Sequence, residues 1–163
     1  MLSMKGKYGL KALCHLAGLG PDEVARSQEI AAEIGMSKKF LDAILGELRE
    51  AGLVVARKGR SGGYRLAAPA EEITAESAIR ALDGPLAPIR CVSLNFYQRC
   101  EDCPDEAACV VRPTMLELRK AMLDVLSRIS IARMRAMPDL PGEEEEKATP
   151  PARRPLRKPP PEA

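Results

Sequence analysis

The sequence predicts a mainly α-helical fold with one small β-hairpin, in which a long C-terminal helix follows a compact helical region. Three observations predict this fold. Apolar residues recur at helical spacing in several segments that are separated by Gly, Pro and capping residues. Two short β-prone runs flank a glycine-rich stretch. The segment that follows Pro113 repeats apolar residues every three or four positions as far as Met137.

The N-terminal part predicts three helices. The apolar residues of "SMKGKYGLKALCHLAGLG" share one helical face, and the glycines at its end stop the helix. In "SQEIAAEIG", Ser27 is the expected N-cap and Gly35 the C-terminal stop. In "SKKFLDAILGELREAG", Ser37 is the expected N-cap, Phe40 and four aliphatic residues share one face, and Gly52 closes the helix. Two short helices joined by a tight turn predict a helix-turn-helix.

A β-hairpin is expected directly after this helix pair. The runs Leu53–Ala56 and Tyr64–Leu66 flank a tip that is rich in glycine and positive charge. A further short helix, "TAESAIRALDG", has Thr74 as its expected N-cap and ends at Gly84. Together these elements predict a winged helix-turn-helix region over residues 1–84, the hairpin being the wing.

The charge distribution indicates a polyanionic partner for this region. Residues 1–65 carry 11 Lys and Arg against 7 Asp and Glu, and the excess lies between Ser37 and Arg65. In a winged helix-turn-helix the second helix of the pair enters the major groove, and the wing lies along the backbone or minor groove. The alternative is a solvated basic hairpin on an ordinary small domain. The residues expected to contact double-stranded DNA are Ser37, Lys38 and Lys39 on the helix and Arg57, Lys58, Arg60 and Arg65 on the wing.

Residues 85–112 form a cysteine-rich segment, called here the cysteine segment, which should be mostly loop. Its cysteines have the spacing C-x8-C-x2-C-x5-C. In a cytosolic protein, clustered thiols indicate metal or redox chemistry. Four roles are possible for these cysteines: ligation of an iron–sulfur cluster, a four-thiolate zinc site, thiol–disulfide sensing and inert packing. Inert packing is the least favoured because the loop is polar, and the acids of "EDCPDE" argue against a strongly activated thiolate.

The C-terminal part predicts a helix and a tail. Pro113 suits the first turn of a helix, and residues 113–137 are expected to be helical throughout. Their heptad-like apolar stripe favours a dimerisation helix over a core helix. Residues 138–163 contain eight Pro among 26 residues, an acidic block and a basic block, so this tail is expected to be disordered.

Several function classes are excluded. No apolar stretch is long enough for a membrane span, and the N-terminus predicts an amphipathic helix and no signal peptide, so the expected location is cytoplasmic. The only histidine, His15, is expected to be structural, and Cys14 is expected in the core. No nucleophile–base pair and no phosphate-binding glycine motif is present, so the chain is not expected to be an enzyme.

The stretches "YGLKALCHLA", "SQEIAAEIGMSKKFLDAILGELREAGLVVARKGRSGGYRLA" and "ITAESAIRALDG", with the cysteines that follow, resemble the Rrf-two family over about residues 1–137. These bacterial winged-helix transcription regulators include iron–sulfur-cluster regulators and nitric-oxide sensors. The resemblance implies a homodimer on a near-palindromic DNA operator, with the long helix as the dimer element. It also implies base-contacting positions for Lys39 and Asp42 and a wing-tip position for Lys58.

The resemblance further implies cluster ligands. Cluster-bearing members use three cysteines and a fourth ligand that varies. Arg112 and Lys7 stand where some subgroups have a ligating His or acid, and neither can serve. Cys100 is additional to the family pattern and supplies a fourth thiolate. The expected cofactor is therefore a 2Fe–2S or 4Fe–4S cluster, with zinc as the alternative. The expected ligands are Cys91, Cys100, Cys103 and Cys109.

The expected protein is a dimeric winged-helix transcription regulator that senses iron–sulfur, redox or nitric-oxide status through a cysteine-bound cluster. Two alternatives keep the same cysteines. One is a winged-helix regulator that is stabilised by zinc or responds through thiol redox chemistry. The other is a zinc-stabilised adaptor that binds protein partners through its long helix and tail, and such a protein would not need a basic wing.

Overall fold

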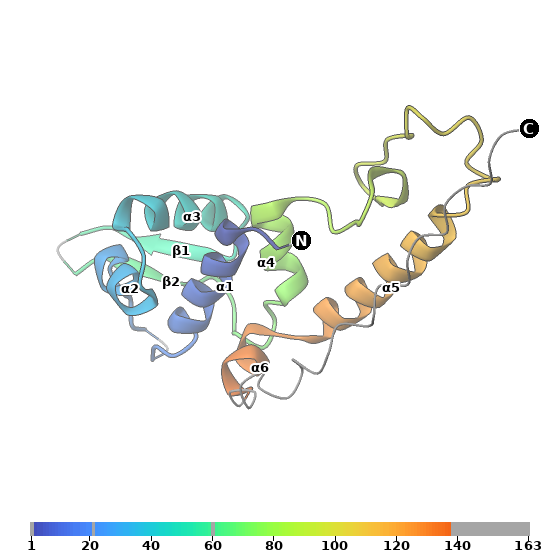
Figure 1. The fold of residues 1–163 in the computed structure, drawn as a ribbon. Coiled ribbons are helices and arrows are strands. Elements are labelled where there is room, and N and C mark those ends of the chain that lie inside the picture. Colours follow the sequence, from blue (N-terminus) through green and yellow to red (C-terminus); the bar gives the residue numbers. More distant parts are fainter. Residues whose placement is uncertain (1, 21, 60, 138–163) are drawn as a thin grey trace, which may run out of the picture.

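A computed structural model describes residues 2–20, 22–59 and 61–137. Helices α1 to α4 and the β1–β2 hairpin form one packed unit, and the cysteine segment leads the chain away from α4 (Figure 1). Helix α5 then brings the chain back, so that α6 lies beside α1. The expected mainly helical fold with one hairpin is confirmed.

Helix α1 (Met4–Leu16) begins at Ser3, whose Oγ accepts a hydrogen bond from the Gly6 N–H at 3.0 Å. Helix α2 (Ser27–Ile34) begins one residue earlier than expected. Its N-cap is Arg26, so the prediction of Ser27 as the cap is wrong. Ser27 is instead the first helical residue, and its side chain hydrogen-bonds Asp42. The left-handed conformation of Gly35 (φ 70°) ends α2, as expected for a residue without a Cβ.

Helix α3 (Lys38–Glu50) and helix α4 (Ala75–Asp83) have the expected caps. The Ser37 Oγ accepts from the Phe40 N–H at 3.4 Å, and the Thr74 Oγ1 accepts from the Ser77 N–H at 3.1 Å. One detail of α3 differs from expectation. Phe40 is 43% exposed, whereas the aliphatic residues assigned to the same face are buried.

Strands β1 (Val54–Arg57) and β2 (Gly63–Leu66) pair antiparallel, each within one residue of its expected bounds. Tyr64 also exchanges two backbone hydrogen bonds with Ala25, at 3.0 and 2.8 Å, which ties the hairpin to the segment before α2. A Cβ at Gly63 would lie 2.6 Å from the Ala25 carbonyl oxygen, so this close approach requires glycine.

The hydrophobic core lies where α1, α2, α3, β1 and α4 meet, and α6 adds one residue to it. Each helix contributes its apolar face, as the sequence periodicity predicts. The largest fully buried side chains of this core are Leu13, Ile30, Leu41, Ile44, Leu45, Leu48, Val54 and Ile131.

The expected continuous helix over residues 113–137 is interrupted. Helix α5 (Arg112–Arg128) ends at Ile129, which is extended (φ −99°, ψ 106°), and Ser130 caps a separate helix α6 (Ile131–Ala136). The cause is a long-range backbone contact. The Ala75 N–H donates to the Ile129 carbonyl and the Ile131 N–H donates to the Ile73 carbonyl, both at 2.8 Å. This pairing replaces helical hydrogen bonds and buries Ile131 completely.

The cysteine segment is mostly irregular, as expected, with one short 3-10 helix, η1 (Arg90–Val92). The predicted disordered tail, residues 138–163, lies outside the described residues. Within the described ranges, no helix combines the length and the apolar character that a membrane crossing requires.

Candidate DNA-binding surface and cysteine segment

The exposed face of α3 carries basic side chains at its N-terminal end and small residues in its middle. Lys39, Ala43, Gly46 and Glu50 lie opposite the buried face of α3 at helical spacing, and we call them the reading face. Lys39 and Ala43 are exposed. A Cβ added to Gly46 would meet nothing within 4 Å, so the middle of the reading face is open to a large partner.

Lys38 and Asp42 flank the reading face as a pair. The Lys38 Nζ donates to the Asp42 Oδ2 at 2.6 Å, and both side chains are substantially exposed. This hydrogen bond, with a second from Ser27, holds the pKa of Asp42 below its usual value in spite of partial burial. Asp42 is therefore a fixed, ionised acceptor beside the lysines at the start of α3.

The hairpin, called the wing, carries the second group of basic residues. Arg57 and Lys58 are exposed at the end of β1, and Arg65 is exposed on β2. Because β1 runs back along α3, the wing tip and the N-terminal end of α3 lie at the same end of the molecule (Figure 1). The structure thus brings Ser37, Lys38, Lys39 and Asp42 to one end together with the wing. Arg60 lies outside the described residues.

The four cysteines of the cysteine segment form two pairs. Cys91 is 4% exposed in η1, and the other three are half-buried. A hydrogen bond with the Cys91 thiol raises the pKa of Cys100. Burial, and then a hydrogen bond with Cys109, raises the pKa of Cys103. Nearby acids add to both shifts, in line with the expectation from the "EDCPDE" stretch.

Cys109 departs from that expectation. The backbone N–H groups of Arg112 and Val111 donate to its sulfur at the start of α5, and they lower the pKa of Cys109. The Arg112 side chain adds a smaller electrostatic effect in the same direction. The acids of the "EDCPDE" stretch therefore do not decide the direction of the shift at Cys109, because backbone amides at a helix start are its main hydrogen-bond partners.

Side chains that the sequence analysis did not single out brace the cysteine segment. The Arg99 guanidinium donates to the carbonyl oxygens of Cys103, at 3.2 Å, and of Pro104. Glu106 accepts a hydrogen bond from the Tyr97 hydroxyl and lies 3.6 Å from the Arg112 Nε. These contacts hold the Cys103–Cys109 half of the segment against the start of α5.

The other half is tied to the middle of α5, where Arg119 donates to the Val92 carbonyl oxygen. The sequence marks Arg99, Arg112 and Arg119 only as charged residues inside a cysteine-rich or amphipathic stretch. That signal does not say which carbonyl or carboxylate each one reaches.

The arrangement of the thiols can be tested against the expected cofactor. In the part of the chain that the structure describes, no group of three or more His, Cys, Asp or Glu side chains is placed to hold a metal ion. The predicted four ligands form two pairs, and Cys103 of one pair lies near enough to Cys100 of the other to help raise its pKa. The donor chemistry itself, four thiols within one segment, fits an iron–sulfur cluster or zinc.

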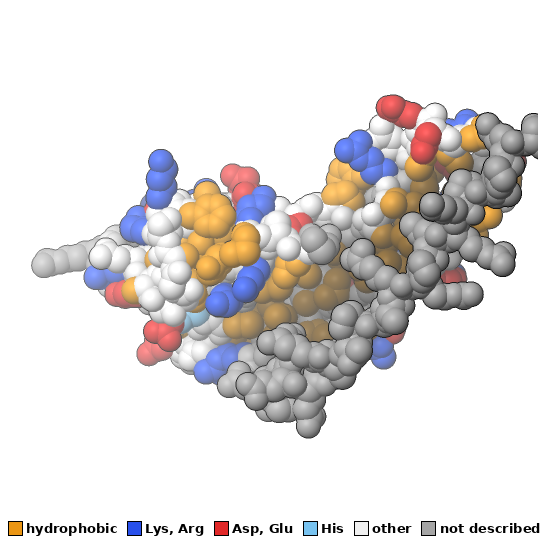
Figure 2. Space-filling view, viewed as in Figure 1, with side chains coloured by type: hydrophobic (Ala, Val, Ile, Leu, Met, Phe, Trp, Pro, Cys, Tyr) orange, Lys and Arg blue, Asp and Glu red, His pale blue; other side chains and the backbone are white. Residues whose placement is uncertain are grey.

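Helix α5 carries an apolar face that its own chain leaves uncovered. None of its residues is buried, and Leu118 and Val125, two turns apart, are 45% and 48% exposed. Figure 2 shows apolar side chains gathered in the hollow between the helical unit and α5. An amphipathic helix with an open apolar face is typical of an interface.

This architecture matches that of known transcriptional regulators. The family model described as "Rrf2: Iron-dependent Transcriptional regulator" matches residues 2–136. An rrf2-like HTH-type transcriptional regulator of Rhodobacter capsulatus is 40% identical over 143 residues, which cover 83% of this chain and 93% of that relative. The HTH-type transcriptional regulator CymR of Bacillus subtilis is 33% identical over 147 residues, covering 88% and 94%.

Solved structures agree with the sequence relatives. CymR, the global cysteine regulator of B. subtilis, has a TM-score of 0.70 at 30% identity and covers 85% of this chain and 98% of its own. IscR of T. potens has a TM-score of 0.63 at 27% identity, covering 82% and 85%. The expected winged-helix fold and the expected absence of an enzyme class are confirmed, since these relatives are transcriptional regulators. The chain belongs to the Rrf2 family of transcriptional regulators.

Proposed function

We propose that this regulator binds double-stranded DNA as a homodimer and that the thiols of the cysteine segment set its DNA affinity. One observation carries the proposal: the open reading face of α3 has its basic end, with Lys38 and Lys39, at the same end of the molecule as the basic wing. A helix of this kind fits the major groove, and the wing reaches the neighbouring backbone.

The residues of this surface have different roles in the proposal. Lys39 and Asp42 contact base edges, since a lysine suits guanine acceptors and a carboxylate suits the cytosine amino group. Ser37 and Lys38, at the start of α3, bind phosphate together with the helix N–H groups. The remaining proposed phosphate contacts come from the wing and are Arg57, Lys58, Arg60 and Arg65.

A second copy of the chain covers the apolar face of α5 in the proposed assembly. Leu118 and Val125 would lie in that interface, where burial of apolar surface favours association. A two-fold symmetric dimer presents two α3 helices to two half-sites about 34 Å apart, which makes the operator near-palindromic. We assign residues 113–137 to dimerisation and residues 1–84 to DNA binding.

The proposed cofactor is an iron–sulfur cluster, held by Cys91, Cys100, Cys103 and Cys109. When bound, such a cluster supplies one-electron chemistry and sensitivity to oxidants or nitric oxide. The description of the family as iron-dependent and the similarity to IscR support this assignment. Four thiolates would also hold zinc, which is the alternative resident metal.

A second candidate is thiol–disulfide sensing without a metal, and the pairing of the thiols favours it. Cys91 with Cys100, and Cys103 with Cys109, are within hydrogen-bonding reach. Oxidation of either pair by a peroxide would remove two electrons and two protons, form one sulfur–sulfur bond and reduce the peroxide to water or alcohol. The similarity to CymR, the global cysteine regulator of B. subtilis, also supports this candidate.

In either case the cysteine segment is placed to act on the dimer. It connects α4, which packs against α1 and α3, to α5, which packs against η1. A change at Cys91 or Cys109 therefore acts on the middle and the start of α5, through the Arg119–Val92 and Arg112–Glu106 contacts respectively. Rotation of α5 in a dimer changes the separation of the two α3 helices. Because the spacing of the two DNA half-sites is fixed, such a change weakens binding to the operator.

The deciding experiment compares metal content with DNA binding. The full chain is purified anaerobically, its iron, sulfide and zinc are quantified, and its operator is obtained by selection from genomic fragments. We expect iron and sulfide in the protein, and a change of about 5- to 150-fold in operator affinity when all four cysteines of the segment are changed to Ala. Equal affinity of the two proteins would rule out the sensing role.

Metal content then separates the candidates. Bound zinc without sulfide supports the zinc alternative, and no metal with peroxide-dependent DNA release supports the thiol switch. Cys100→Ala on its own tests the fourth ligand: loss of the bound iron assigns Cys100 as a ligand, and an equally stable cofactor places the ligand elsewhere. Absence of any duplex binding at low salt would instead favour the adaptor.

A further inference from the structure

Helix α3 contains a glycine that its own chain does not explain. Gly46 lies in the middle of α3, which continues unbroken from Lys38 to Glu50. Glycine in the interior of a helix is less favourable than alanine, because it has more backbone freedom to lose on folding. Such a glycine is explained when the fold needs either its backbone conformation or the space that a Cβ would fill.

The backbone conformation does not require glycine at position 46. The described glycines with positive φ lie at helix ends or in loops and are Gly35, Gly52, Gly59 and Gly84. Gly46 has the helical conformation of its neighbours, which every amino acid except proline adopts readily. Alanine or leucine at this position would therefore keep the backbone of α3 as it is.

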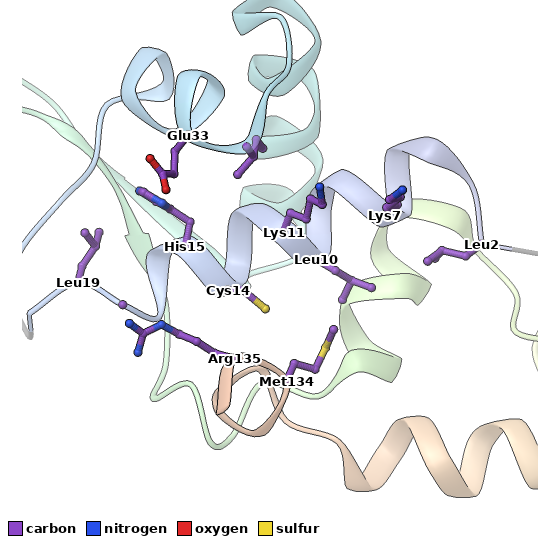
Figure 3. Close-up of a pocket in the computed structure, with 12 residues that line it drawn as sticks. Leu2, Lys7, Leu10, Lys11, Cys14, His15, Leu19, Glu33, Met134 and Arg135 are labelled. Atoms are coloured by element: carbon purple, nitrogen blue, oxygen red, sulfur yellow. The ribbon is translucent and has the colours of Figure 1, made fainter. Parts of the chain in front are cut away.

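Other glycines of the chain are explained by a close neighbour. A Cβ at Gly9 of α1 would lie 2.0 Å from a methyl carbon of Leu82 on α4. A Cβ at Gly18, just after α1, would lie 3.0 Å from a guanidinium nitrogen of Arg135, which Figure 3 shows reaching from α6 toward the end of α1. In both cases the missing Cβ allows another part of the chain to come close.

Gly46 has no such neighbour among the described residues. A Cβ at this position would meet nothing within 4 Å, and the exposed Lys39 and Ala43 share its side of α3. Helix α3 packs against α1, α2, α4 and β1 through its buried face, and it lies along an outer edge of the packed unit (Figure 1). The space at Gly46 is therefore open to another molecule.

The charges along the reading face indicate which molecule enters this space. Lys39 is exposed two turns before Gly46, and Glu50 is exposed about one turn after it. A polyanion is attracted to the start of this face and repelled at its end. Gly46 lies between the two, where the first turns of α3 leave a DNA groove and the helix passes the sugar–phosphate edge of the groove. A Cβ at this point would hold the helix away from the DNA.

We propose that Gly46 is a positioning residue for DNA, because its lack of a side chain lets the backbone of α3 approach the edge of the major groove closely. This inference rests on the proposed function and adds to it the depth at which α3 enters the groove. At that depth Lys39 and Asp42 reach base edges, which carry the sequence information. A larger side chain at position 46 moves α3 outward and separates these residues from the bases, whereas the wing keeps its phosphate contacts.

Gly46→Ala and Gly46→Leu, made in the full chain, should have opposite effects on folding and on DNA binding. Both replace a glycine in a helix interior by a better helix former, so the urea midpoint should rise by roughly a few tenths of a molar. Fluorescence anisotropy should show weaker binding to the operator, by about tenfold or more for Gly46→Leu and by less for Gly46→Ala. The affinity for a scrambled duplex of the same length should change little, because phosphate contacts do not depend on sequence.

Ser127→Leu is the matched control. Ser127 is exposed on the polar side of α5, and this change adds the same leucine side chain to a helix without altering any charge. The control should bind the operator and the scrambled duplex like the natural chain. A loss of operator affinity in the Gly46 variants alone then belongs to position 46.

Three results would overturn the proposal. Variants that are more stable but bind the operator like the natural chain would show that DNA does not use the space at Gly46. An equal loss of affinity for the operator and the scrambled duplex would exclude an effect on base contact. Lower stability, or a changed oligomeric mass in light scattering, would mean that a second copy of the chain fills the space. In all three cases the natural chain still binds its operator, whereas a natural chain that binds no duplex at low salt would contradict the proposed function and this inference with it.

Discussion

At the scale of single residues, the two lysines proposed to contact DNA most directly have no packing role in the fold. Lys39 is exposed at the centre of the basic end of α3, and Lys58 is exposed at the wing tip. Neither forms an ion pair within the described part of the chain. Their charges are therefore available to a polyanion, and the two positions should contribute differently.

Lys39→Ala and Lys58→Ala should separate base contact from phosphate contact. Loss of a base-contacting lysine costs about 1–3 kcal/mol of discrimination between the operator and a mismatched sequence. Loss of a phosphate-contacting lysine weakens binding to all sequences and lowers the slope of log K against log salt by about 0.9. Both effects are measured by fluorescence anisotropy over a salt series.

Lys120→Ala is the control for these two variants, since Lys120 is an exposed lysine of α5 that is paired with Glu117 at 2.8 Å. If all three variants reduce affinity to the same extent, the effect is one of net charge. The assignment of Lys39 to base contact would then be wrong.

At the scale of secondary-structure elements, α5 stands apart from the other long helices because it has no buried residue. Helices α1 and α3 bury their apolar faces in the core of their own chain. An amphipathic helix gains its stability from packing more than from helix propensity, so α5 requires a covering surface. A second chain is the occupant that the Rrf2 fold and the proposed function favour.

Changing both Leu118 and Val125 to Glu should convert a dimer into a monomer. Two carboxylates in an apolar interface cost several kcal/mol, whereas on an exposed helix face of a monomer they cost little. Multi-angle light scattering after size exclusion measures the mass, and circular dichroism checks that the helices persist. Glu117→Ala, on the polar side of the same helix, is the control, and a double variant of unchanged dimeric mass would place the interface elsewhere.

At the scale of the whole molecule, α6 connects α5 to the core. Ile131 has no exposed surface, although it lies close in sequence to the exposed residues of α5. Its backbone N–H is held by Ile73, on the segment that enters α4. The position of α5 is therefore coupled to the packing of the DNA-binding region, and this coupling can be measured as stability.

Ile131→Ala should destabilise the chain by about 2–5 kcal/mol, because it removes a fully buried side chain and leaves a cavity. Urea denaturation followed by circular dichroism gives the difference, provided that protein concentration is the same for all variants. Leu94→Ala is the control, since Leu94 is 61% exposed and should change stability by less than about 0.5 kcal/mol. A loss for Ile131→Ala as small as that of the control would mean that α6 is not part of the folding unit.

The sequence by itself determined the helix-turn-helix, the wing and the short helix α4, because their boundaries depend on local chemistry. Ser37 and Thr74 cap the helices that follow them, and Gly35 ends α2 in the left-handed conformation that glycine adopts most easily. The family resemblance also rests mainly on the sequence motifs of this N-terminal region. Only the Ser27 cap and the exposure of Phe40 differ, and both depend on side chains of other elements.

The tertiary structure alone decided the break between α5 and α6 and the pairing of the cysteines. The break depends on the contact of Ile129 with Ala75, far apart in the chain, and the pairing depends on how the loop brings Cys91 to Cys100. Helical periodicity continues through Ser130, so no local signal could show that its neighbours prefer a strand-like partner. The four-cysteine spacing likewise drew attention to the thiols as a group, whereas the pairs that they form follow from how Tyr97, Arg99 and Arg112 fold the loop.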